Sequence, residues 1–109
     1  MLRLKKLLFV CSRNKWRSLT AETIFKKRPG LLVKSAGTER SARIVVTAKM
    51  IIWADIIFVM ERRHKEKLLH KFPQETAHAT LITLDIPDTY RFMEPELIDE
   101  IQLSVSEYI

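Results

Sequence analysis

Residues 7–18, LLFVCSRNKWRS, decide the fold of this 109-residue chain. The apolar run 7–10 is short and uninterrupted, which is typical of a buried strand in a parallel sheet. A tight turn is expected next, and a helix should begin near Arg17. Cys11, the only cysteine of the chain, therefore lies where the strand ends, and Arg17 and Ser18 follow at the sixth and seventh positions after it. This order of strand, turn and helix predicts a loop that binds an anion.

The residue types in the turn suit a phosphate group. Backbone N–H groups of such a loop point inward at the anion, and the N-terminus of the following helix adds partial positive charge. Arg17 can hold two oxygens with its planar guanidinium, a geometry that lysine cannot supply. A thiol attacks phosphorus as the thiolate, which this kind of environment stabilises. The predicted substrate-binding residues are Ser12, Arg13, Asn14, Lys15, Trp16 and Ser18. The simpler alternative for Cys11 is a small buried apolar residue at a strand end.

The rest of the chain alternates short apolar runs with helical patterns. Strands are predicted at 7–10, 31–34, 56–60 and 80–84, helices at 17–28, from Thr47, at 61–71 and from Pro95, and a loop at 72–79. This alternation predicts one α/β domain, 1–109, whose parallel sheet is covered on both faces. Right-handed crossovers place a ligand site at the carboxyl ends of the strands, where the strand order reverses.

Charge is distributed unevenly along the chain. The net charge is +6, yet residues 1–84 hold 18 Lys/Arg against 6 Asp/Glu, while residues 85–109 hold one Arg against seven acids. A basic body favours anionic ligands, namely phosphate groups, phosphorylated proteins or nucleic acid. No apolar run approaches the roughly 20 residues that cross a bilayer, so no membrane association is expected. A working thiolate needs a reducing compartment, which points to the cytoplasm.

An acid that protonates the leaving oxygen should lie over the loop. Asp88 is the best candidate, because Pro87 stiffens the approach and Tyr90 can line the opening. Asp85 is the second candidate, because it follows the predicted strand directly. Either residue can also be an ordinary turn-forming aspartate.

The histidines point to no metal site. His64, His70 and His78 show no metal-ligand spacing with each other or with Cys11, and their neighbours are polar or charged. We therefore expect surface histidines, no metal and no cofactor. Trp53 lies between apolar helix positions and is expected in the core.

The chain resembles the low-molecular-weight protein tyrosine phosphatases. The matching segments, which occur in the family's order, are Leu8–Cys11 with Asn14, Arg17–Ser18, Ala21–Glu22 and Ile24–Phe25, then Ser35–Thr38, Ala54–Glu61 and Ile86–Tyr90. The resemblance implies a three-layer α/β sandwich with a four-stranded parallel sheet of order 2-1-3-4 and a phosphate-binding loop after strand 1.

The resemblance also implies a two-step covalent reaction. By it Cys11 is the nucleophile that forms a phosphocysteine, and Arg17 binds the phosphoryl group. Asp88 would protonate the leaving group and then activate water. Such transfer through a thiolate is sound chemistry on the residues alone. Ser18 would assist the thiolate as a leaving group.

A further implied role concerns the loop itself. Asn14 would hold its backbone shape, aided by Ser35. The chain departs from the family at several positions: Arg13 replaces a glycine, Trp16 replaces a second cysteine, Leu19 and Thr89 replace prolines, and the segment between Thr38 and Ala42 is shortened. A shallower and more basic entrance suits a small phosphate ester as well as a phosphorylated protein.

Phosphate-monoester hydrolysis is therefore the predicted function, and inorganic phosphate or sulfate is expected to bind. The alternative is a catalytically weak phosphate-binding or regulatory module on the same fold. An arsenate reductase would need further cysteines for its internal relay, and the chain has none. Nucleic acid is not expected as a partner, because no binding pattern of alternating aromatic and basic residues is present.

Overall fold

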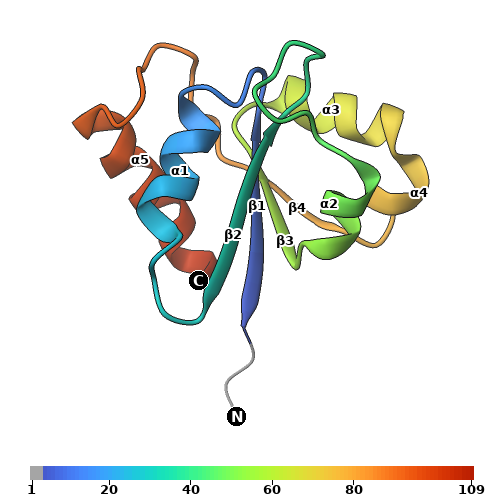
Figure 1. Cartoon of the computed structure of the whole chain (residues 1–109), viewed down its shortest axis with the longest axis horizontal. Coiled ribbons are helices and arrows are strands. Elements are labelled where there is room, and N and C mark those ends of the chain that lie inside the picture. The colour runs from blue at the N-terminus through green and yellow to red at the C-terminus, as the bar shows by residue number, and fades with distance from the viewer. Residues whose placement is uncertain (1–3) are drawn as a thin grey trace.

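The computed structural model describes residues 4–109, which fold around one parallel sheet (Figure 1). Its strands are β1 (Lys5–Cys11), β2 (Leu31–Gly37), β3 (Ile56–Val59) and β4 (Thr80–Thr83). All neighbouring pairs are parallel, and the spatial order is β2-β1-β3-β4. The predicted sheet and its order are confirmed. The order reverses at β1, so the carboxyl end of β1 lies at the switch point where open α/β sheets bind ligands.

Helices cover both faces of the sheet (Figure 1). One face carries α1 (Arg17–Phe25) and α5 (Pro95–Val105), which continues into a short 3-10 turn, and the other carries α2 (Ala48–Trp53), α3 (Arg62–Lys71) and α4 (Pro73–Thr76). The three-layer prediction is thereby confirmed. Within residues 4–109, no helix has the length and apolar character that spanning a membrane requires.

Three element predictions need correction. The second strand continues to Gly37, three residues beyond its predicted end at residue 34. The first helix ends at Phe25 instead of continuing to residue 28, because Pro29 and Gly30 follow closely and the chain turns into β2. The predicted loop 72–79 contains the short helix α4, which starts at Pro73. Proline is favoured at the first helical position, because its missing N–H has no partner to lose there.

Successive side chains of β1 point to opposite faces of the sheet and pack into two separate apolar layers. Phe9 packs toward α1 and α5, where its ring stacks on Phe25 at 5.8 Å and on Phe58 at 5.1 Å between centroids. Leu8 and Val10 face the opposite layer. All three β1 residues are fully buried, as expected of a strand covered on both faces. Since Cys11 ends this strand, the strand's position in the core determines where the sulfur lies.

Two large apolar residues on the helices α2 and α3 lie at the surface. Ile52 on α2 is 70% exposed, and Leu69 on α3 is 41% exposed. Their neighbours Ile51 and Leu68 occupy the buried positions of those helices. Adjacent residues of a helix are offset by about 100° around its axis, and on these two helices one side chain of each pair packs into the core while the other reaches solvent.

Candidate active site

A pocket of about 270 Å³ opens at the carboxyl end of β1. The residues that line it come from the loop after β1, the turn after β2, the start of α3 and the segment after β4: Cys11, Ser12, Arg13, Lys15, Trp16, Arg17, Glu39, Arg63 and Asp88. Four segments that are distant in the sequence therefore meet at one edge of the sheet.

The sulfur of Cys11 lies at the base of this pocket and faces hydrogen-bond donors. The backbone N–H of Asn14 donates to Sγ at 3.3 Å, and the hydroxyl of Ser18 lies 2.9 Å from Sγ. Cys11 is 3% exposed, but its sulfur has polar partners. The alternative of an inert apolar cysteine does not fit these contacts. The sulfur therefore lies against a loop N–H group and a hydroxyl of the first turn of α1.

Asn14 connects the loop to the rest of the fold. Its φ of 56° lies in the left-handed region, which asparagine tolerates better than most residues. Its side-chain amide donates to the hydroxyls of Ser18 and Ser35, both at 2.8 Å. Ser35 in turn donates to Glu22. Asn14 is fully buried, so it holds the loop in shape and does not line the pocket.

The carbonyl groups of residues 11–14 are bound by the segment after β2. They accept hydrogen bonds, in chain order, from the N–H groups of Thr38 (2.9 Å), Glu39 (3.0 Å) and Arg43 (2.9 Å) and from Nε of Arg43 (3.3 Å). In a planar trans peptide the following N–H points opposite to the carbonyl. The N–H groups of residues 12–15 therefore face inward, and the short segment after β2 holds them there.

Gly37 permits this close approach. A Cβ at this position would lie 2.5 Å from the carbonyl oxygen of Ser12 and 2.6 Å from Cβ of Ala42. Neither neighbour is the end of a flexible side chain, so no larger residue fits without moving the loop. Arg13, by contrast, causes no backbone strain where the family resemblance implies glycine: among residues 4–109 the non-glycine positive φ values belong to Asn14, Asp85 and Met93.

The Arg17 side chain is 2% exposed and fixed on two sides. Its Nη1 donates to Oε1 of Glu61 at 2.6 Å and to the carbonyl of Ile86 at 2.7 Å. Its Nε lies 3.6 Å from Oδ1 of Asp88. The guanidinium is thus held between the start of α3 and the segment after β4, beside the candidate acid, in the pocket that Cys11 also lines.

Glu61, at the start of α3, joins Arg17 to a second arginine. The same Oε1 accepts from Nη2 of Arg63 at 2.9 Å and from its Nε at 3.3 Å. Burial alone would raise the pKa of Glu61, but the hydrogen bonds and charges of the two arginines outweigh burial and lower it. Glu61 is therefore an anion at neutral pH.

His64 contradicts the expectation of a surface histidine, because it is fully buried. Its Nδ1 accepts the backbone N–H of Glu61 at 3.0 Å, so the ring proton is on Nε2, which donates to the hydroxyl of Ser12 at 2.9 Å. Burial, followed by the positive charges of Arg17 and Arg63, lowers the pKa of His64 to about 4. A neutral imidazole thus supports the loop from behind.

The sequence carried a signal for His64 that we did not use. Glu61 and His64 stand at the N-cap and third helical positions of α3, where side chains exchange hydrogen bonds with the helix start. Leu68 follows His64 by four residues and is also buried, so the two share the inner face of α3.

The structure separates the candidate acids. Asp88 lines the pocket, whereas Asp85 lies with Glu61 and Pro87 in a neighbouring surface depression. Tyr90 does not line the pocket: it packs against the apolar layer under α1 and α5. Partial burial, then the negative charge of Glu100, raises the pKa of Tyr90.

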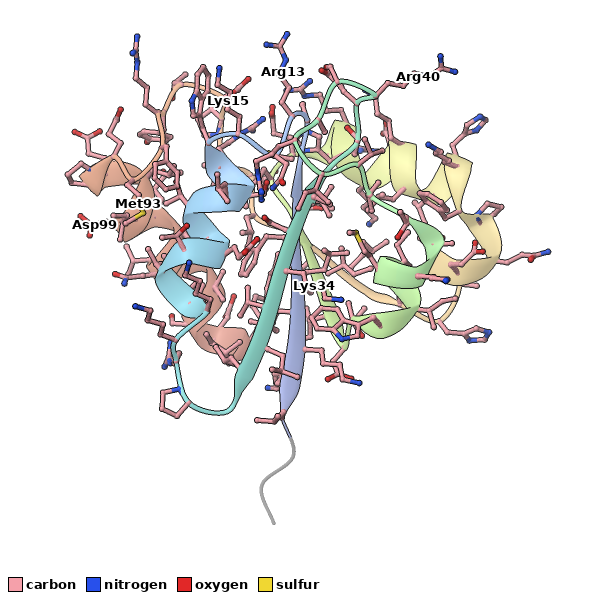
Figure 2. All side chains as sticks on the ribbon, viewed as in Figure 1. Arg13, Lys15, Lys34, Arg40, Met93 and Asp99 are labelled. Atoms are coloured by element: carbon pink, nitrogen blue, oxygen red, sulfur yellow. The ribbon has the colours of Figure 1, made fainter. Side chains whose placement is uncertain are left out.

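The rim of the pocket is basic and exposed. Figure 2 shows Arg13 and Lys15 reaching outward at the end of the molecule where the loops after β1 and β2 lie. Arg13 is ion-paired to Glu39 at 3.4 Å, and the Lys15 ammonium lies 5.2 Å from the ring centre of Trp16. Trp53 is not part of this site; it packs against the second apolar layer. Residues 4–109 contain no group of three His, Cys, Asp or Glu side chains arranged to hold a metal.

No protein-family model and no curated protein matches the chain, but solved structures do. The tyrosine phosphatase Wzb from Escherichia coli K30, solved with phosphate, is 18% identical with a TM-score of 0.77, over 96% of each chain. The low-molecular-weight protein tyrosine phosphatase SP-PTP from Streptococcus pyogenes is 17% identical with a TM-score of 0.77, over 97% of this chain and 94% of its own. The YwlE arginine phosphatase from Geobacillus stearothermophilus is 23% identical with a TM-score of 0.69, over 95% of this chain and 93% of its own. The chain therefore has the fold of the low-molecular-weight protein tyrosine phosphatases.

Proposed function

We propose that residues 1–109 form one domain of the low-molecular-weight protein tyrosine phosphatase family, which hydrolyses phosphate monoesters through a phosphocysteine intermediate. One observation carries the proposal: the Cys11 sulfur lies within 3.3 Å of a loop N–H and 2.9 Å of a hydroxyl, in a pocket that Arg17 and Asp88 also line. Nucleophile, phosphoryl-binding group and acid thus converge on one volume.

In the first step the Cys11 thiolate attacks phosphorus, an S–P bond forms, and the bond from phosphorus to the ester oxygen breaks. The inward N–H groups of the loop and the Arg17 guanidinium bind the non-bridging oxygens, whose charge they stabilise during transfer. The carboxyl of Asp88, 3.6 Å from Arg17, gives its proton to the departing oxygen.

In the second step a water molecule attacks phosphorus and the S–P bond breaks. The Asp88 carboxylate takes the water proton, and Cys11 leaves as a thiolate. Ser18 Oγ already accepts from Asn14, so its own proton is available to Sγ at 2.9 Å, nearer than the Ala36 carbonyl at 3.4 Å. Ser18 thereby stabilises the departing sulfur. Protein side chains and water suffice for both steps.

The substrate is a phosphorylated protein or a small phosphate ester, and inorganic phosphate binds as the product. The solved neighbours include proteins named as tyrosine phosphatases and as an arginine phosphatase, which supports a phosphorylated substrate in general. A single catalytic cysteine functions in a reducing compartment, so we place the protein in the cytoplasm.

Hydrolysis of para-nitrophenyl phosphate tests the proposal. The Cys11→Ser variant should lose at least about a thousandfold in kcat, because loss of a nucleophile removes the covalent route. Asp88→Asn should retain burst formation of phosphocysteine, detectable by mass spectrometry after quenching, and turn over slowly. Asp85→Asn is the matched control and should behave as the wild type, because Asp85 lies outside the pocket.

Full activity in Cys11→Ser would rule out the mechanism. If phosphate raises the melting temperature of the wild type but the wild type hydrolyses no para-nitrophenyl phosphate, the chain is a phosphate-binding module instead.

A further inference from the structure

A second hollow shares the lining residue Arg63 with the catalytic pocket. This hollow, called the α3 groove below, has a volume of about 670 Å³ and is lined by Thr38, Arg63, Glu66, Lys67, His70 and Lys71. Arg63 also lines the catalytic pocket, and its guanidinium is bound to Glu61, the partner of Arg17. The two hollows are therefore adjacent, with Arg63 between them.

The groove is basic along its whole length. Arg63, Lys67 and Lys71 follow one another at intervals of four residues, which places them on one face of α3. Like charges at this spacing repel one another, so the stripe does not stabilise the helix. The acid of the groove, Glu66, is ion-paired to Arg62 at 3.2 Å. No acidic side chain of residues 4–109 forms a salt bridge with Lys67 or Lys71, and the ring contact of the Lys71 ammonium with Phe72, at 5.6 Å, brings no negative charge to it.

The length of the stripe limits the size of the ligand. Arg63 and Lys71 are eight residues apart, which corresponds to about 12 Å along a helix at about 1.5 Å per residue. An extended peptide advances about 3.3 Å per residue. The stripe therefore matches about four residues of an extended chain that leaves the catalytic pocket.

We propose that the α3 groove binds acidic residues of a protein substrate within about four positions of its phosphorylated residue. This inference rests on the proposed function, because the phosphorylated residue is held by the catalytic pocket. Charge complementarity selects an acidic segment. A peptide fits better than a single-stranded nucleic acid, because the groove residues include no Phe, Tyr or Trp on which bases would stack.

Binding to the Cys11→Ser variant tests the groove without turnover. The probes are two phosphotyrosine peptides with four glutamates before or after the phosphotyrosine, and matching peptides with glutamines. We expect one acidic peptide to bind about tenfold tighter than its glutamine match at 0.15 M salt, a size that a few exposed charge pairs can supply. Adding Lys67→Glu and Lys71→Glu should abolish this ratio.

The control is Lys26→Glu with Lys27→Glu, which makes the same change of charge at the end of α1 and should keep the ratio. Both control lysines are exposed and precede β2, on the face of the sheet opposite α3.

Equal binding of acidic and glutamine peptides, failure of all of them to bind, or a ratio that survives the groove substitutions would overturn the inference. Lys67- and Lys71-dependent binding of a single-stranded oligonucleotide without any peptide preference would also overturn it. Hydrolysis of para-nitrophenyl phosphate by the wild type reports separately on the proposed function, so the two failures are distinguishable.

Discussion

The base of the pocket and its rim are built on opposite principles. At the base, Cys11, Asn14, Arg17 and Ser18 are buried, and each has at least one named hydrogen-bond partner. At the rim, Arg13 and its neighbours are exposed and held by weak ion pairs or a ring contact. Buried polar networks act as units, whereas exposed charges act almost independently. Changes at the base should therefore cost much, and changes at the rim little.

Among substitutions that leave the Cys11 nucleophile in place, the largest effect is expected for Arg17→Lys. Lysine keeps the charge but cannot hold two oxygens at once, and it leaves the buried contacts to Glu61 and Ile86 incomplete. We expect kcat on para-nitrophenyl phosphate to fall by about a hundred- to a thousandfold, the usual cost of losing one transition-state donor. Arg13→Lys is the matched control and should change kcat less than threefold. Equal losses of kcat in the two variants would contradict the expected difference between the base and the rim of the pocket.

The next largest effect should be a loss of folding stability at acid pH, caused by the buried residues at the base of the pocket. The pKa of His64 is about 4 in the folded protein against 6.5 in the unfolded chain, so the unfolded chain binds more protons between these pH values. The contribution of His64 to the free energy of unfolding is fully present above pH 6.5. It is lost as the pH drops toward 4, and the loss amounts to up to about 3 kcal/mol. Glu61, whose pKa is lowered from 4.5, adds a loss in the same direction at lower pH. Urea unfolding at a series of pH values measures the slope.

His64→Gln sharpens this test. Glutamine does not titrate, but its amide can still donate toward Ser12. The variant should therefore lose stability less steeply between pH 6.5 and 4 than the wild type. An unchanged slope would show that His64 is not the titrating group.

Gly37→Ala should give an intermediate effect, because Gly37 packs against the backbone of the loop after β1 and does not itself line the pocket. The added Cβ would meet the Ser12 carbonyl at 2.5 Å, and overpacking of this kind costs about 1–3 kcal/mol. We expect a lower melting temperature and weaker protection by inorganic phosphate. Gly30→Ala is the control: it has open space around its Cβ position, although its φ of 86° adds a strain of its own. If phosphate protection falls equally in both variants, the effect is not specific to the loop.

The smallest effect belongs to the rim. Arg13→Gln removes an exposed ion pair to Glu39, which contributes about 0.2–1 kcal/mol at most. Stability and kcat should stay close to those of the wild type, and KM for an anionic ester should rise no more than about threefold and become less sensitive to salt. A tenfold loss of kcat would show that Arg13 contributes to catalysis as much as the buried residues at the base of the pocket, which would contradict this prediction.

Local patterns in the sequence were sufficient for the strand, loop and helix that carry Cys11 and Arg17, because a buried strand, a turn and a helix start are each encoded by neighbouring residues. The sheet order is different: the alternation of elements predicts only a parallel sheet, and the order β2-β1-β3-β4 was implied by the family resemblance. Asp88 was preferred over Asp85 on the stiffness of the adjoining proline, and the structure brings Asp88 to the pocket and leaves Asp85 outside it.

The tertiary structure alone decided what surrounds the loop. Glu61 lies 44 residues from Arg17, and His64 lies 52 residues from Ser12, and neither contact has a local signature. Tyr90 follows Asp88 closely yet turns into the apolar layer, because packing under α5 outweighs its proximity in sequence. Short-range patterning specifies which backbone a segment adopts, but partners of buried polar groups are chosen by which segments the sheet brings together.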